Sequence, residues 1–104
     1  MYESKLKGEA ADALFKAILS LENEEECYRF FEDVCTISEV GSIAQRWEVA
    51  RLLARGLTYS AIAEKTGAST ATVSRVGKCL HYGANGYKLA LERLAAKETL
   101  DNSK

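Results

Sequence analysis

The sequence of 104 residues predicts an all-α fold, on three observations. It contains no proline, the residue that most strongly interrupts helices, and it is rich in Ala, Leu, Glu and Lys, which favour helices. Apolar residues recur at the three- and four-residue spacing of a helix along most of the chain. Residues 57–80 have the spacing of a helix-turn-helix, two short helices that meet at a glycine. We therefore expect a single all-helical domain over residues 1–97, followed by a frayed polar tail over residues 98–104.

Two amphipathic helices are predicted at the start of the chain. The first is expected from Ser4 to Leu21, along an apolar stripe at helical spacing. The stripe consists of Leu6, Ala10, Leu14, Ile18 and Leu21. Asn23 is placed to cap the second helix, whose first turn carries three glutamates that suit the positive end of the helix dipole. A monomer this small can hardly hide both apolar faces, so residues 1–35 are predicted to be dimerisation helices that pair with a second copy.

A capping box predicts the start of the third helix. Thr36 and Glu39 have the spacing at which each side chain satisfies the exposed amide of the other. The helix should run to Arg55 and end at Gly56. Its inner stripe is expected to be Val40, Ile43, Ala44, Trp47, Ala50 and Ala54, with Leu53 beside it.

The helix-turn-helix predicted over residues 57–80 has a steric reason at each step. Its first helix is expected over residues 58–66, and Gly67 supplies the left-handed backbone conformation that ends it sharply. Ser69 or Thr70 can cap the second helix. The buried positions of the two helices are expected to be Ile62, Ala63, Val73 and Val76.

The outward side of the second of these helices predicts contact with DNA. The outward residues are Thr70, Ala71, Thr72, Ser74, Arg75 and Lys78. They are short and polar at the start and cationic further along, as a helix in the major groove requires, because small groups reach base edges and charges meet phosphates. A helical corner used only for packing is the alternative.

One more helix is predicted after a break over residues 81–86. Asn85 can cap a helix that runs from about Gly86 to Ala96. Its inner side is expected to carry Tyr87, Leu91 and Leu94.

The net charge of −1 hides a strong asymmetry between the two parts of the chain. Residues 1–41 carry four bases and ten acids, whereas residues 42–97 carry nine bases and three acids. The cationic part therefore contains the predicted helix-turn-helix, as a phosphate-binding surface requires. Attraction between opposite halves across a dimer would explain the same asymmetry, and both explanations can hold together.

Composition argues against several other classes of protein. No apolar run is long enough to span a membrane, and the first residues have no secretory character. Three cysteines, Cys27, Cys35 and Cys79, suit reduced thiols in the cytoplasm, give no metal-binding spacing and predict no cofactor; Cys79 is expected to be a small buried thiol. An enzyme is poorly supported, because His81 is the one histidine and no glycine-rich phosphate loop is present.

Residues 53–56, Leu-Ala-Arg-Gly, and 67–75, Gly-Ala-Ser-Thr-Ala-Thr-Val-Ser-Arg, resemble the Trp repressor family, most closely its YerC/YecD-type branch of small Trp-repressor-like proteins. The likeness extends from about Thr36 to Leu94, with a one-residue gap after Gly56 relative to the tryptophan-binding member. It implies a six-helix, intertwined homodimer whose first helices interlock between subunits. It also implies a transcriptional regulator, a repressor, that reads a near-palindromic operator.

The resemblance further implies a set of DNA-binding residues. Thr70, Ala71 and Thr72 would face the bases, and Ser60, Ser74 and Lys78 would face phosphates. Ser69 and Arg75 complete the predicted set. Threonine side chains lack bidentate geometry, so water and DNA shape would carry much of the specificity.

An effector pocket is the last implication of the resemblance, and here the sequence departs from the family. Arg46 and Arg75 match the two arginines that hold tryptophan in the family repressor, and Thr36 of the other subunit matches a pocket position. Val76 stands where the tryptophan-binding member has a glycine, and Cys79 replaces a pocket serine. We hypothesise that Val76 fills the slot an indole ring would enter, so that the recognition helix is held without tryptophan. For Arg75, contact with DNA is favoured over ligand binding, and for Arg46 the two stay open.

The sequence thus favours a homodimeric, cytoplasmic regulator that binds double-stranded DNA, with no membrane partner. The alternative is a helical protein-interaction or adapter dimer whose helix-turn-helix is vestigial.

Overall fold

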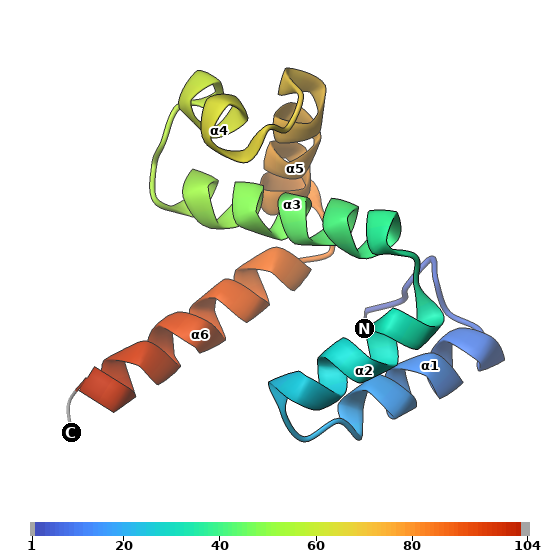
Figure 1. The fold of residues 1–104 in the computed structure, drawn as a ribbon. Coiled ribbons are helices and arrows are strands. Elements are labelled where there is room, and N and C mark those ends of the chain that lie inside the picture. Colours follow the sequence, from blue (N-terminus) through green and yellow to red (C-terminus); the bar gives the residue numbers. More distant parts are fainter. Residues whose placement is uncertain (1, 103–104) are drawn as a thin grey trace. The chain divides into compact units, whose positions relative to one another are not determined.

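The computed structural model describes residues 2–102, and these contain six α-helices and no strand (Figure 1). The helices are α1 (Glu9–Leu19), α2 (Glu24–Val34), α3 (Ile37–Ala54), α4 (Tyr59–Thr66), α5 (Thr70–Tyr82) and α6 (Gly86–Asn102). The all-α class predicted from the sequence is confirmed.

The chain divides into two compact units, Met1–Gly41 and Ser42–Lys104, with the boundary inside α3. The single domain expected over residues 1–97 stays a prediction. The two units differ in burial, because no residue of α1 or α2 is buried, whereas the described residues of the second unit enclose an apolar core.

The first helix is shorter than the range of residues 4–21 expected from its apolar stripe. It begins at Glu9, because Ser4 holds the preceding residues in a turn: its hydroxyl accepts a hydrogen bond from the amide of Leu6 at 3.0 Å, and its carbonyl accepts one from the amide of Lys7 at 3.3 Å. Local side-chain bonds of this kind compete with the helix. Leu6 consequently stays 71% exposed and is no part of an inner stripe.

The starts of α2 and α3 follow the capping signals of the sequence. The Oδ1 atom of Asn23 accepts a hydrogen bond from the amide of Glu26 at 2.9 Å. The hydroxyl of Thr36 accepts from the amide of Glu39 at 3.1 Å, and a carboxylate oxygen of Glu39 accepts from the amide of Thr36 at 2.8 Å. Hydrogen bonding of the Glu39 carboxyl to the backbone amide of Thr36, and secondly to the Thr36 side chain, holds the pKa of Glu39 below its ordinary value. Both predicted caps are confirmed.

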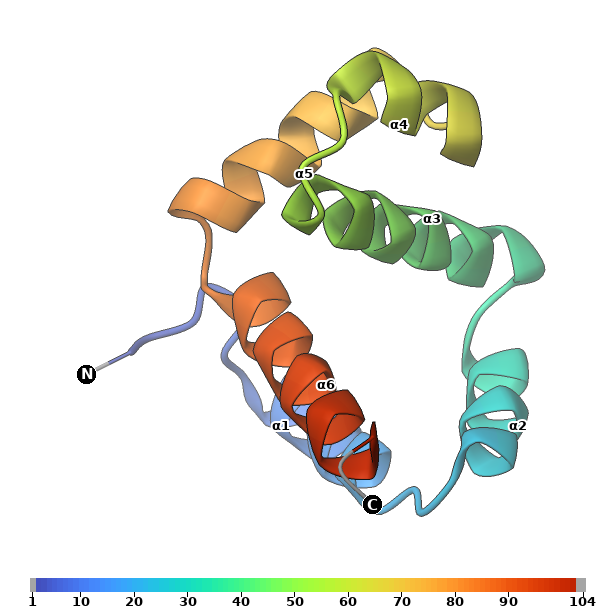
Figure 2. The same ribbon diagram turned by 90° about the vertical axis from the view of Figure 1, so that its left-hand side faces the viewer.

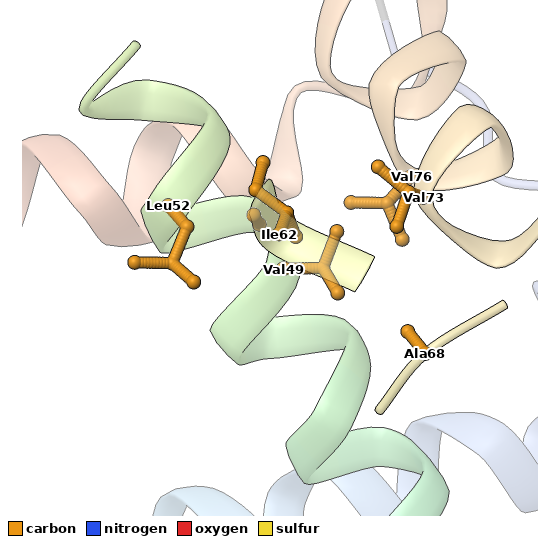
Figure 3. Close-up of a cluster of buried hydrophobic side chains, with 7 residues drawn as sticks. Val49, Leu52, Ile62, Ala68, Val73 and Val76 are labelled. Atoms are coloured by element: carbon orange, nitrogen blue, oxygen red, sulfur yellow. The ribbon is translucent and has the colours of Figure 1, made fainter. Parts of the chain in front are cut away.

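The core of the second unit lies where α3, α4 and α5 meet, and Figures 1 and 2 both show α4 and α5 on the same side of α3. Figure 3 shows the buried side chains from these helices and from the turn between α4 and α5. The buried apolar residues are Val49, Ala50, Leu52, Ile62, Ala68, Val73 and Val76. Of the positions predicted for the helix-turn-helix, Ile62, Val73 and Val76 are fully buried, and Ala63 is partly buried against them.

Helix α3 meets this core with only part of the expected stripe. Ala50 is buried and Leu53 packs against the core, as predicted, but the burial of Val49 and Leu52 was not predicted. Val40 and Ile43, predicted to be on the inner stripe, are 37% and 49% exposed. The expected stripe positions Ala44 and Ala54 are also exposed. The sequence of α3 is apolar on two faces, and α4 and α5 cover only one of them.

Helix α6 is longer than expected, because it runs to Asn102 rather than to Ala96. Residues 98–102 of the expected frayed tail are therefore helical, and residues 103–104 lie outside the described part of the chain. Tyr87 packs against the core and stacks on the ring of Trp47, with ring centroids 6.3 Å apart. Leu94, expected to be on the inner side, is 49% exposed.

Candidate nucleic-acid interface

The turn between α4 and α5 is fixed by a small hydrogen-bond network. Gly67 takes the left-handed conformation, with φ 75°, and its amide donates to the carbonyl of Ala63 at 2.9 Å. The hydroxyl of Thr66 accepts from the amide of Ala68 at 3.1 Å, and the side-chain amide of Gln45 in α3 donates to the carbonyl of Thr66 at 3.2 Å. With Ala68 buried in the core, the turn is tied to the scaffold from both sides.

Each of the two helices around the turn has a side-chain cap. The hydroxyl of Thr58 accepts from the amide of Ala61 at 3.2 Å at the start of α4. At the start of α5 it is Ser69, rather than Thr70, whose hydroxyl accepts from the amide of Thr72 at 3.1 Å. The orientation of α5 is thus set by its cap at one end and by its buried valines along its inner face.

The predicted DNA-binding residues all retain exposed surface. Ser60, Ser69, Thr70, Ala71, Arg75 and Lys78 are exposed, and Thr72 and Ser74 are half-buried. Within residues 2–102, the side chains of Arg75 and Lys78 form no ion pair or hydrogen bond. Their positive charge is therefore not neutralised by the chain itself, and it is available to an external anion.

Sequence reasoning missed the close approach of Tyr59 to α5. Gly77 is buried in the middle of α5, and a Cβ atom at that position would lie 2.6 Å from the hydroxyl oxygen of Tyr59 and 3.9 Å from Cδ1 of Leu53. A side chain at position 77 would therefore require the phenol of Tyr59 to move. The available signal was a glycine in a helix interior, which often marks close packing.

The residues predicted for an effector pocket have different environments. Val76 is 1% exposed and belongs to the core, Arg46 is half-buried and Arg75 is exposed. Cys79 is exposed, so the expectation of a buried thiol is wrong. Thr36 was assigned to the pocket of a second subunit, so a single chain does not assemble the complete set, and the pocket stays a prediction.

An open apolar groove lies within the first unit. Its volume is about 730 Å³, and α2 and the start of α3 line it. Its walls include Cys27, Tyr28, Phe31, Ile37 and Val40. Ile37 is 94% exposed and Tyr28 is 66% exposed, which is unusual for large apolar side chains gathered at one place.

Two other kinds of site were sought over residues 2–102. This part of the chain contains no group of three or more His, Cys, Asp or Glu residues arranged to hold a metal ion. None of its helices has the length and apolar character needed to cross a bilayer.

Comparison with known proteins places these features in a family. The family model described as Trp repressor protein matches residues 9–95. The chain belongs to the Trp repressor family. The resemblance noted in the sequence is thereby confirmed, and this membership favours a DNA-binding regulator over an enzyme.

Similar chains are known from several bacteria. A Bacillus subtilis (strain 168) protein, uncharacterized protein YerC, is 56% identical over 104 residues, and the match covers all of both chains. A crystal structure of a TrpR-like protein from Eubacterium eligens ATCC 27750 is 58% identical with a TM-score of 0.84, covering 88% of this chain and 94% of that one. A crystal structure from Staphylococcus aureus, of a protein proposed to be a Trp repressor, is 50% identical with a TM-score of 0.84, covering 88% and 91%. These neighbours confirm the six-helix Trp-repressor-like fold.

Proposed function

We propose that this protein is a homodimeric, sequence-specific DNA-binding transcriptional repressor of the cytoplasm, and that α5 is its recognition helix. The observation that carries the proposal is the two-sidedness of α5. Val73, Val76 and Gly77 are buried, so the helix is held rigidly, while its opposite side presents short polar groups and unpaired cations. Such a helix can lie in the major groove with its first turn at the base edges.

The distribution of charge supports the same function. The nine bases and three acids of residues 42–97 give the part of the chain that contains α5 an excess of positive charge. Arg75 and Lys78 have no internal partner within the described residues. Phosphates are the complementary partner, and binding that releases their counterions weakens steeply with added salt.

The dimer in the proposal is supported by surface that one chain leaves uncovered. The groove of about 730 Å³ in the first unit is apolar, and no residue of α1 or α2 is buried. Exposed apolar patches of this kind mark interaction surfaces. A two-fold dimer would present two recognition helices about one DNA turn apart, roughly 34–36 Å.

The proposed repressor does not depend on tryptophan. Its support is Val76, which is 1% exposed and packed with Val73 in the core, at the position where the tryptophan-binding relative has a glycine. A side chain already fills this place, so α5 is held in position without a bound indole. Isothermal titration of the purified protein should show no saturable heat with tryptophan; tight, saturable binding would refute this part of the proposal. An effector of another chemical class stays open.

Salt-dependent binding to duplexes selected from a random-sequence library tests the proposed function. The wild-type protein should bind them with an affinity that falls steeply between about 50 and 200 mM salt. Lys78→Ala should weaken all duplexes about equally and reduce the salt slope by about 1. The matched control is Lys16→Ala, because Lys16 is also exposed but lies in the acidic first unit, and it should leave the slope unchanged.

Thr72→Ala tests the orientation of α5 on the duplex. It should reduce discrimination between operator variants while leaving the salt slope intact. If Thr72→Ala changed the slope and Lys78→Ala changed discrimination, the helix would lie the other way round. A dimer with no duplex affinity at physiological salt would instead support the protein-interaction module.

A further inference from the structure

Ser69 and Thr72 form a two-hydroxyl pair at the start of α5. The Oγ atom of Ser69 accepts a hydrogen bond from the backbone amide of Thr72 at 3.1 Å. The same hydroxyl donates its own hydrogen to the Oγ1 atom of Thr72 at 3.0 Å. The cap of α5 is therefore also a support for the side chain of Thr72.

This arrangement uses up the donor capacity of Ser69. A serine hydroxyl has one hydrogen and two lone pairs, and Ser69 spends the hydrogen and one lone pair on Thr72. What it still offers outward is one lone pair, which phosphate oxygens repel. Ser69 is exposed and was predicted to contact DNA, but with its pair intact it has no hydrogen to give to a phosphate or a base.

Thr72, in contrast, keeps its hydrogen. Its Oγ1 atom accepts from Ser69 and retains one hydrogen and one lone pair, and accepting a hydrogen bond strengthens a hydroxyl as a donor. The bond also restricts the rotation of the half-buried side chain, so the remaining hydrogen can point in few directions. Thr72 lies in the first turn of α5, the part of a recognition helix that reaches base edges.

We propose that Ser69 is a positioning residue that fixes the Thr72 hydroxyl as a hydrogen-bond donor toward an acceptor on a base edge. The inference rests on the proposed DNA-binding function. In the major groove, guanine offers N7 and O6, adenine offers N7 and thymine offers O4, whereas cytosine offers only a donor. The strengthened donor therefore favours a base that offers an acceptor over cytosine at the one base position that Thr72 reads.

A double-mutant cycle of Ser69→Gly and Thr72→Val tests the pairing. Glycine keeps most of the stability of an N-cap but removes the hydroxyl, and valine keeps the shape of threonine without its hydroxyl. The readout is the ratio of dissociation constants between a duplex selected from a random library and its single-base cytosine variants. Ser69→Gly should lower this ratio by about 3- to 10-fold at one position, the worth of one neutral hydrogen bond. In the Thr72→Val background it should have no further effect.

Two controls separate positioning from simple support of the helix. Thr58→Gly removes the equivalent cap of α4, which bonds the amide of Ala61 but pairs with no other hydroxyl, and it should leave discrimination unchanged. Thr72→Ser keeps a hydroxyl and should keep the coupling to Ser69. Thermal unfolding of every variant checks that the fold is intact.

The outcomes distinguish this inference from the proposed function. Equal losses from Ser69→Gly in both backgrounds, or losses at different base pairs for the two single variants, would overturn the pairing while duplex binding stands. The same holds if Thr58→Gly lowers discrimination as much as Ser69→Gly does. Absence of salt-dependent duplex binding by the wild-type protein would instead overturn the proposed function itself.

Discussion

The two units of this chain contain helices of similar regularity but differ in what the helices bury. In the second unit, α3, α4 and α5 enclose seven apolar residues between them. In the first unit, α1 and α2 have no buried residue, although both are regular helices of 11 residues. The first unit thus has its secondary structure without a core of its own.

The difference shows that local signals and packing contribute separately. Asn23 and the Thr36–Glu39 pair begin helices through bonds within four residues, and such bonds need no tertiary structure. Helices of 11 residues are nevertheless marginal in water by themselves, because nucleation is costly. We therefore expect the first unit to gain stability from an apolar cover, for which the proposed second copy is our candidate.

The largest expected difference is in the cost of removing an aliphatic side chain. Ile62→Ala in the second unit should lower the free energy of unfolding by about 2–5 kcal/mol, because Ile62 is 0% exposed and a cavity remains. Leu19→Ala in the first unit removes as many carbon atoms, but Leu19 is 84% exposed, so the change should stay within about 0.5 kcal/mol. Urea unfolding measures both. Equal losses would mean that Leu19 is covered in solution.

A charged residue placed in the groove of the first unit should weaken the proposed dimer. Ile37→Asp replaces an apolar side chain with a carboxylate. The Ile37 side chain is 94% exposed and lines the groove. We expect the dimer dissociation constant to rise at least about tenfold, or about 1.4 kcal/mol, in sedimentation equilibrium. Tyr82→Asp is the control, because Tyr82 is 89% exposed but lies outside the groove. A wild-type protein that stays monomeric at all concentrations would remove the basis of the comparison.

Removing a helix cap, which is worth about 1 kcal/mol, should have a different effect in each unit. Thr58→Ala removes the cap of α4 and should lower global stability by about that amount, because α4 belongs to the core. Asn23→Ala removes the cap of α2 and should instead speed the exchange of α2 amides about fivefold, without changing those of α4 and α5. Native-state hydrogen exchange reads both effects. Uniform acceleration by Asn23→Ala would show that the units unfold together.

The smallest expected effect is a pH dependence at the start of α3. Thr36 lowers the pKa of Glu39 in the folded chain, so the capping box contributes fully above the pKa of an unfolded glutamate. The contribution is lost as pH falls through the lower pKa of the folded state. NMR titration of the Glu39 carboxyl should give a midpoint below the ordinary glutamate value. Thr36→Ala removes the hydroxyl but keeps the backbone amide, which is the larger cause, so it should raise the midpoint only in part. A wild-type midpoint at the ordinary glutamate value would contradict the capping box.

The features predicted correctly from the sequence are those that depend only on residues close together in the chain. Asn23 and Gly67 act within a few residues, so their roles were visible from spacing. The valines of α5 were also found, because their helix is apolar on one side only. The face of α3 was predicted only in part. Ala50 is buried as expected, but α3 is apolar on two sides, and only the positions of α4 and α5 select Val49 and Leu52.

The candidate site was predictable in its residues but not in their partners. The exposed face of α5 follows from the burial of Val73 and Val76 on the other side. That Ser69 pairs with the Thr72 hydroxyl depends on side-chain rotamers, which spacing does not fix. The predicted start of the first helix was wrong for a related reason, because Ser4 bonds its own backbone neighbours instead of starting the helix.

The packing of Tyr59 on Gly77 has a consequence for natural variation among related chains. A methyl group at position 77 would meet the phenolic oxygen at 2.6 Å, so the Tyr59 ring would have to move away from α5. Homologues with alanine or serine at 77 should therefore either carry a smaller residue than tyrosine at 59 or hold that tyrosine turned away from α5.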